Sequence, residues 1–159
     1  MFERKYDFDD ISLISRQIST IKSRDMIDTT SFLFDKKYKT PIIASPMKDV
    51  CDENIANEIN RLGGIGIIHG FMSIEDQVKI ATNDNQNKHI YSIGINNDYI
   101  DRYKALIDVG VKHFCIDVAN GDSKYSLKAI TSLKLKFPDA SLMAGNVCTE
   151  DGYARLAEN

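Results

Sequence analysis

The stretch HFCIDVANGDSKYS, residues 113–126, decides the fold class. Its first half is an apolar run typical of a buried strand, and its second half is a turn that leads into a helix. Asp117 interrupts the apolar run where the strand ends. Ligands of parallel α/β proteins bind at the carboxyl ends of the strands, so a carboxylate there is placed to accept hydrogen bonds from a sugar or an amide. The alternative is a structural role, in which Asp117 accepts backbone N–H groups and fixes the turn.

The same strand-then-helix pattern occurs five times along the chain. Apolar runs at 40–47, 65–71, 90–95, 113–119 and 141–147 each precede a segment that reads as a helix. Strands that are apolar on both faces belong in a parallel sheet covered by helices, so the fold class is α/β. Five units make either an open doubly wound sheet or part of a (β/α)8 barrel, which needs roughly 200 residues or more. No G-x-G-x-x-G motif follows the first strand, so a Rossmann fold is disfavoured.

Composition excludes several classes of function. The 159 residues carry a formal net charge of −3 without Lys/Arg clusters, so we expect neither a nucleic acid nor a membrane as partner. The charged N-terminus is unlike a signal peptide, and no apolar run is long enough to span a membrane. The three cysteines (Cys51, Cys115 and Cys148) are too widely spaced for a disulfide framework or a zinc site, and neither Cys115 nor Cys148 has the surroundings of an activated thiol. We therefore expect a cytoplasmic protein with reduced thiols and no metal site.

Polar residues follow the other predicted strands as well. Ser45, in ASPM, is able to donate to a ligand, and Met47 adds a flexible apolar surface. Asn146, in AGNV, offers an amide that both donates and accepts. His69 also ends a strand, where a structural role is the preferred interpretation of a single histidine. The N-terminal stretches YDFDDISLI and IKSRDMID are interpreted as a lead-in segment that packs against the barrel.

Taken together and in this order, seven stretches resemble the IMP dehydrogenase/GMP reductase family. They are FDDISLI, KSRDMID, PIIASPMKDV, RLGGIGIIH, SIEDQ, IDVANG and AGNVCT, and they extend from about residue 7 to the C-terminus. Members of this family are (β/α)8 barrels. The resemblance therefore implies a partial TIM barrel with about the first five βα units, and residues 1–159 are interpreted as the N-terminal portion of that barrel. Only residues 82–89 separate the second helix from the third strand, so no CBS module is inserted there.

The resemblance also implies roles for individual residues. Asp117, Val118 and Ala119 match positions that contact the nicotinamide cofactor. Ser45, Met47 and Asn146 match positions near the purine nucleotide, GMP or IMP. Ser23 and Arg24 match the pair that, in GMP reductases, reaches a cofactor bound by a neighbouring subunit; an isolated arginine such as Arg24 is otherwise a surface salt-bridge partner.

Two activities within the family remain open. DVANG is typical of GMP reductases, which use NADPH to convert GMP to IMP with loss of ammonia, and this is the favoured reading. ASPM and RLGGIGIIH look more like a CBS-less IMP dehydrogenase, which oxidises IMP to XMP with NAD+. A third reading is a non-catalytic half-barrel that pairs with another chain.

The sequence also departs from the family pattern. Family members usually place Lys or Arg after the histidine of the second strand, whereas this chain has Gly70. The loop that carries the family's nucleophilic cysteine, the monovalent-cation site and the phosphate-binding glycine loops are expected beyond Asn159, so no catalytic residue is assigned. We expect a fragment of a longer protein, a split protein or a relic whose isolated chain is inactive. Its expected partners are further copies of itself or a complementary C-terminal half-barrel chain.

Overall fold

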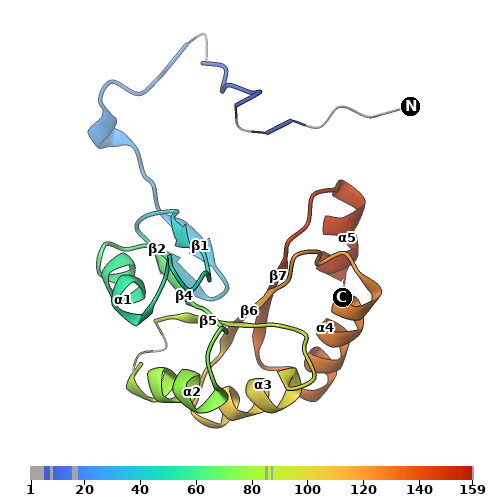
Figure 1. Cartoon of the computed structure of the whole chain (residues 1–159). Coiled ribbons are helices and arrows are strands. Elements are labelled where there is room, and N and C mark those ends of the chain that lie inside the picture. The colour runs from blue at the N-terminus through green and yellow to red at the C-terminus, as the bar shows by residue number, and fades with distance from the viewer. Residues whose placement is uncertain (1–5, 8, 16–17, 85, 87, 159) are drawn as a thin grey trace.

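A computed structural model describes residues 6–7, 9–15, 18–84, 86 and 88–158. Its main sheet has five parallel strands in the order β3–β4–β5–β6–β7, which is also their order in the chain. The strands are β3 (Ile43–Ala44), β4 (Ile65–Ile68), β5 (Ile90–Ile93), β6 (His113–Asp117) and β7 (Ser141–Gly145). The sheet is curled into a partial barrel (Figure 1). The predicted α/β class and partial TIM barrel are confirmed, and the open doubly wound sheet is excluded.

A helix follows each strand of this sheet. They are α1 (Glu53–Arg61), α2 (Ile74–Asn83), α3 (Tyr99–Asp108), α4 (Lys124–Lys136) and α5 (Glu150–Glu158). Side-chain caps begin three of them: Asp52, Ser73 and Ser123 each accept a hydrogen bond from a backbone N–H in the first turn. Helices α1 to α4 lie along the outer side of the curled sheet (Figure 1).

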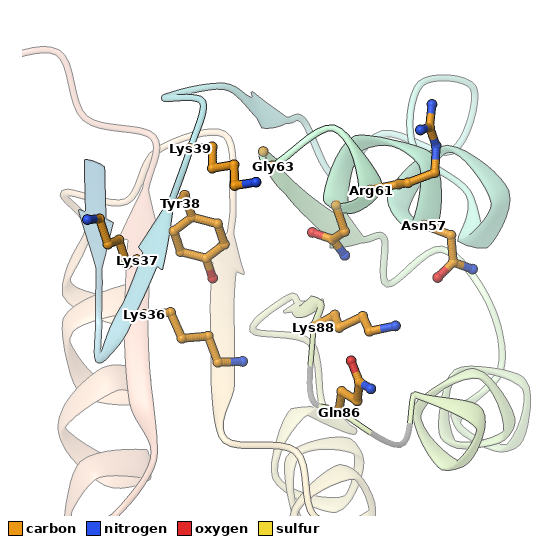
Figure 2. A pocket seen from close by; sticks show the side chains of 11 residues that line it. Lys36, Lys37, Tyr38, Lys39, Asn57, Arg61, Gly63, Gln86 and Lys88 are labelled. Atoms are coloured by element: carbon orange, nitrogen blue, oxygen red, sulfur yellow. The ribbon is translucent and has the colours of Figure 1, made fainter. Parts of the chain in front are cut away.

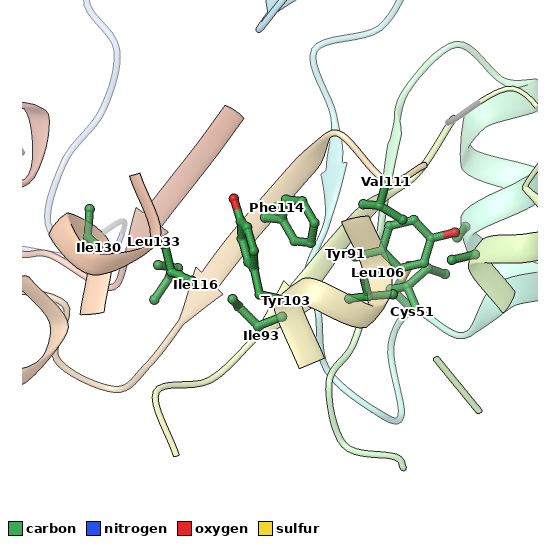
Figure 3. Packing of buried hydrophobic residues seen from close by; sticks show 13 residues of the cluster. Cys51, Tyr91, Ile93, Tyr103, Leu106, Val111, Phe114, Ile116, Ile130 and Leu133 are labelled. Atoms are coloured by element: carbon green, nitrogen blue, oxygen red, sulfur yellow. The ribbon is translucent and has the colours of Figure 1, made fainter. Parts of the chain in front are cut away.

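Two apolar clusters pack on the opposite faces of the sheet. The outer cluster joins alternate strand residues to the helices, and its largest members include Tyr91, Phe114 and Tyr103, whose ring stacks on Phe114 at 4.0 Å (Figure 3). The inner cluster is smaller and consists of Ile65, Ile67, Ile90 and Cys115. Strands buried on both faces explain why their sequences show continuous apolar runs rather than alternation.

An antiparallel hairpin covers part of the inner face. Its strands are β1 (Ser31–Leu33) and β2 (Lys36–Tyr38). Leu33, Phe34 and Tyr38 pack against the inner cluster, and the Phe34 ring stacks on His113 at 4.8 Å. His113 begins β6, so the hairpin closes the amino end of the partial barrel. The sequence interpretation did not include this hairpin.

The lead-in segment does not pack against the barrel, so that prediction is wrong for the described residues. Leu13, Ile14 and Ile18 have exposed fractions of 101%, 96% and 83%. The segment contains a short 3₁₀ turn, η1 (Arg24–Met26), and the side-chain hydrogen bonds of Ser19 and Ser23 reach only residues two positions away. Figure 1 shows the segment leading away from the sheet.

Candidate functional site

The carboxyl ends of the strands carry four of the polar residues singled out from the sequence. Ser45 follows β3, His69 follows β4, Asp117 ends β6 and Asn146 follows β7. These strands belong to one parallel sheet, so their carboxyl ends form one edge of the curled sheet, here called the carboxyl rim. Asp117 pairs in register with Gly145, which places it directly beside the start of the AGNV turn. In barrels the active site is built at this end of the strands.

Asp117 places a carboxylate at the end of β6. Side chains alternate along a strand, so Asp117 points to the same face as Cys115, which belongs to the inner cluster. The carboxylate is half-buried and accepts no hydrogen bond from any residue that the structure describes. Burial raises the pKa of Asp117 above its ordinary value. The described residues therefore do not support the structural alternative, in which Asp117 fixes the turn by accepting backbone N–H groups.

Other groups hold the turn that follows Asp117. Val118 donates its N–H to the carbonyl of Gly145 at 3.1 Å. Its own carbonyl accepts the backbone N–H of Asn146 at 2.8 Å and the Asn146 side-chain amide at 3.0 Å. The N–H of Gly121 then donates to the carbonyl of Asn146 at 2.7 Å. Ala119 is exposed within this locked turn. The side-chain NH₂ of Asn146 thus already donates a hydrogen bond within the chain, which the sequence did not predict.

Ser45 and Met47 lie in the turn between β3 and α1. Both are exposed, and Met47 has an exposed fraction of 54%. The carbonyl of Met47 accepts the N–H groups of Val50 and Cys51, each at 3.0 Å, which leaves the Met47 side chain outside the turn. Both residues are therefore accessible at the rim.

Ser23 and Arg24 do not join the rim. Ser23 caps η1 by accepting the N–H of Asp25, and its hydroxyl donates to the Asp25 carboxylate at 3.1 Å. Arg24 is exposed. Both belong to the lead-in segment, which Figure 1 shows apart from the sheet, so within this chain they face no other candidate residue.

The two cysteines considered from the sequence differ in surroundings. Cys115 is buried, and burial together with the nearby carboxylate of Asp117 raises the pKa of its thiol to about 12. A thiol with such a pKa is a poor nucleophile at neutral pH. Cys148 is exposed and follows the AGNV turn. The described residues contain no group of three His, Cys, Asp or Glu side chains that would hold a metal ion.

His69 supports the turn after β4. Its side chain is buried, and Nδ1 accepts the backbone N–H of Phe71 at 3.1 Å. Burial is the main reason that the pKa of His69 is lowered, with the positive charge of Lys48 acting in the same direction. The imidazole is thus held neutral, with its proton on Nε2, as a structural residue would be.

A buried polar network below the rim was not found from the sequence. Gln77 of α2 is fully buried, and its side-chain NH₂ donates to the carbonyls of His69 at 3.2 Å and Ser92 at 2.8 Å. Arg102 of α3 donates to the Gln77 side-chain oxygen at 2.9 Å and to the carbonyl of Met72 at 2.9 Å. The network fixes the carboxyl ends of β4 and β5. The only sequence signal was the polar Gln77 on the apolar face of its helix.

Gly70 has a structural reason to lack a side chain. A Cβ built on Gly70 lies 2.9 Å from the carbonyl oxygen of Ser92, which is closer than real Cβ atoms come to a backbone oxygen. The same carbonyl accepts the Gln77 hydrogen bond, so it is not free to move away. The backbone of this chain therefore has no room at this position for the lysine or arginine that the family resemblance led us to expect.

Comparisons with known proteins agree with this geometry. The family model described as IMP dehydrogenase / GMP reductase domain matches residues 5–159. The chain belongs to this family. A GMP reductase from Lactobacillus johnsonii is 33% identical over 156 residues, which cover 95% of this chain and 46% of that protein. A GMP reductase from Streptococcus pneumoniae is 28% identical, with the same two coverages.

A solved structure shares the fold. The inosine 5′ monophosphate dehydrogenase from Legionella pneumophila superimposes with a TM-score of 0.86 and is 32% identical, and the match covers 95% of this chain and 47% of that one. The chain thus spans about half the length of the relatives that it matches. Members of this family are nicotinamide-dependent oxidoreductases that act on purine nucleotides. Among the described residues, no helix has both the length and the apolar character that crossing a membrane requires.

Proposed function

We propose that this chain is the N-terminal part of a GMP reductase, which converts GMP to IMP with NADPH and releases ammonia. The observation that carries the proposal is the half-buried carboxylate of Asp117. It lies at the carboxyl rim on the inner face of the sheet, without a hydrogen-bond partner among the described residues. A buried carboxylate without a partner is costly, and a ligand that donates to it removes that cost.

The rim residues divide between cofactor and substrate in this proposal. Asp117 accepts hydrogen bonds from the ribose or the carboxamide of the cofactor, and Val118 and Ala119 form the surface beside it. Ser45 and Met47 contact the purine nucleotide, since both are exposed in the turn after β3 at the same rim. Asn146 orients the nucleotide through its side-chain oxygen, because its NH₂ group already donates to Val118.

The contribution of this chain is binding and orientation. The reduced cofactor supplies hydride when it is bound. The cysteine thiolate that attacks the purine comes, in this proposal, from residues outside the present sequence. Cys115 does not replace it, because burial keeps its thiol protonated. We therefore expect the isolated chain to be inactive.

The open edges of the sheet indicate where the remaining part of the enzyme binds. Among the described strands, β3 and β7 each pair on one side only. All residues of β7 are half-buried, and Ile42 and Ile43 at the opposite edge have exposed fractions of 55% and 44%. Unpaired parallel edges favour strand pairing. We propose a complementary C-terminal half-barrel, in the same or another polypeptide, in a cytoplasmic homo-oligomer where Ser23 and Arg24 reach a neighbouring cofactor.

IMP dehydrogenase is the second candidate. It is supported by the likeness to the Legionella pneumophila enzyme and by the stretches ASPM and RLGGIGIIH. The likeness to GMP reductases and the DVANG turn favour the first candidate.

Complementation tests the proposal. The chain is co-expressed with the C-terminal half of the Lactobacillus johnsonii GMP reductase, and NADPH absorbance is followed after GMP is added. We expect NADPH consumption by the complex and none by either half alone. Formation of NADH from NAD+ and IMP would support the second candidate instead. A stably associated complex without either reaction, or steady NADPH consumption by the isolated chain, would contradict the proposal.

A further inference from the structure

A hollow lies at the opposite edge of the sheet from the carboxyl rim. It has a volume of about 620 Å³ and is bounded by β2, the end of α1 and the segments that precede β4 and β5 (Figure 2). Gly63 and Gly64 line it just before β4, and Lys88 lines it just before β5. The hollow therefore belongs to the amino end of the strands, and the proposed reaction does not use it.

Positive charge is concentrated around this hollow. Five basic side chains line it, and its described lining contains no carboxylate, although the chain as a whole has a formal net charge of −3. The five are Lys36, Lys37, Lys39, Arg61 and Lys88. A concave surface lined by one sign of charge focuses the electrostatic field and attracts ligands of the opposite sign.

The five side chains differ in direction and in the contacts that they already make. Figure 2 shows Lys36 and Lys39 extending from β2 toward the α1 side, whereas Lys37 points to the other side of the hairpin. Arg61 already donates to the carboxylate of Glu58, at 2.6 and 2.8 Å. Lys36 and Lys39 therefore approach from one wall, while Lys88 belongs to the segment before β5.

We propose that this hollow binds a small oligophosphate, of the class formed by inorganic polyphosphates and the phosphate chain of nucleoside triphosphates. Lysine ammonium groups bind phosphate as point charges. Lysines on two walls suit a ligand with several charges better than a single carboxylate. The volume is in the range of small-molecule sites, roughly 300–1,000 Å³. The lysines lie on two sides of a hollow of limited volume, which favours a small ligand over a nucleic acid strand.

Amide NMR of the full chain tests the proposal. Tripolyphosphate, ATP and inorganic phosphate are each titrated at about 0.15 M salt, where long-range attraction between exposed charges is largely screened. We expect tripolyphosphate and ATP to bind more tightly than phosphate and to shift the amides of residues 36–40, 60–64 and 88–89. Equal affinity for tripolyphosphate and ATP identifies the phosphate chain as the bound group, and tighter binding of ATP adds a contribution from the nucleoside.

Two double variants separate this site from general charge attraction. Lys39→Gln with Lys88→Gln is expected to weaken tripolyphosphate binding at least about tenfold, and Lys39→Arg with Lys88→Arg to retain it. Lys79→Gln with Lys104→Gln, on the exposed surfaces of α2 and α3, removes the same charge and is expected to leave binding unchanged. Circular dichroism checks the fold of each variant. Equal weakening by both Gln variants, absence of binding at this salt, or a short single-stranded RNA that binds more tightly than tripolyphosphate would overturn the proposal.

Discussion

The guanidinium of Arg102 donates a hydrogen bond to the side-chain oxygen of Gln77 at 2.9 Å, and both side chains are buried. Gln77 in turn holds the carbonyls of His69 and Ser92. One interaction between α2 and α3 therefore fixes the ends of two strands of the carboxyl rim. A candidate site on a partial barrel depends on such a network to keep its geometry.

Replacing Gln77 with Leu is expected to destabilise the chain by about 2–4 kcal/mol, because Arg102 and two carbonyls then lose a partner in a buried location. Gln77→Glu keeps the acceptor for Arg102 but removes the NH₂ group, so it is expected to destabilise as well. Urea denaturation measures both. Lys79→Gln, on the exposed side of the same helix, is the control and is expected to change stability by less than about 0.5 kcal/mol. An unchanged urea midpoint for Gln77→Leu would contradict the claim that this network stabilises the fold.

Adding a side chain at Gly70 is expected to cost about 1–3 kcal/mol, since its Cβ would meet the carbonyl of Ser92 at 2.9 Å. Thermal unfolding of Gly70→Ala measures this cost. Gly94→Ala is the matched control at the end of the neighbouring strand, because the nearest atom to its Cβ is 3.8 Å away. Equal melting temperatures for the two variants would contradict the close approach between β4 and β5.

Asp117→Asn is expected to stabilise the chain at pH 7 and to weaken cofactor binding. Burial raises the pKa of Asp117, so the folded state binds this proton more tightly than the unfolded state. Stability therefore falls as the pH rises from the unfolded pKa through the higher folded pKa, and the loss persists above it. Asparagine removes this loss, so the gain should be present at pH 7 and absent below the ordinary value of 3.8. Denaturant titrations at several pH values measure it.

The same variant is expected to weaken NADPH binding by the complemented enzyme about tenfold or more, because a hydrogen bond to a charged acceptor is lost. Fluorescence titration of NADPH checks this. Wild-type affinity in Asp117→Asn, with or without the gain in stability, would remove the proposed role of Asp117 in cofactor binding.

The five βα units were predictable because each strand is apolar on both faces and each helix has apolar residues at helical spacing. The hairpin was not. Its turn is formed by Phe34 and Asp35, and Phe34 adopts a φ of 54°, which favours glycine or asparagine. The sequence therefore lacks the usual hairpin signal, and the inner cluster that stabilises this turn depends on tertiary packing.

The rim was predictable from position alone, because parallel strands carry their carboxyl ends to one edge. The interactions below it were not. Gln77 and Arg102 are 25 positions apart in the sequence, and only the packing of α2 against α3 brings them together. The exposure of Leu13 and Ile14 was likewise not readable from their apolar character, which by itself predicts burial.

Backbone amide NMR of the isotope-labelled chain during an NADPH titration tests most directly whether these strand ends form a nucleotide-binding surface. The predicted result is a change in the amide chemical shifts of rim residues, which is lost in Asp117→Asn. The rim residues are Ser45, Gly94, Asp117, Ala119 and Asn146. Shifts confined to the amino end of the strands, or no shifts at millimolar NADPH, would contradict the claim that the carboxyl rim binds the nucleotide cofactor.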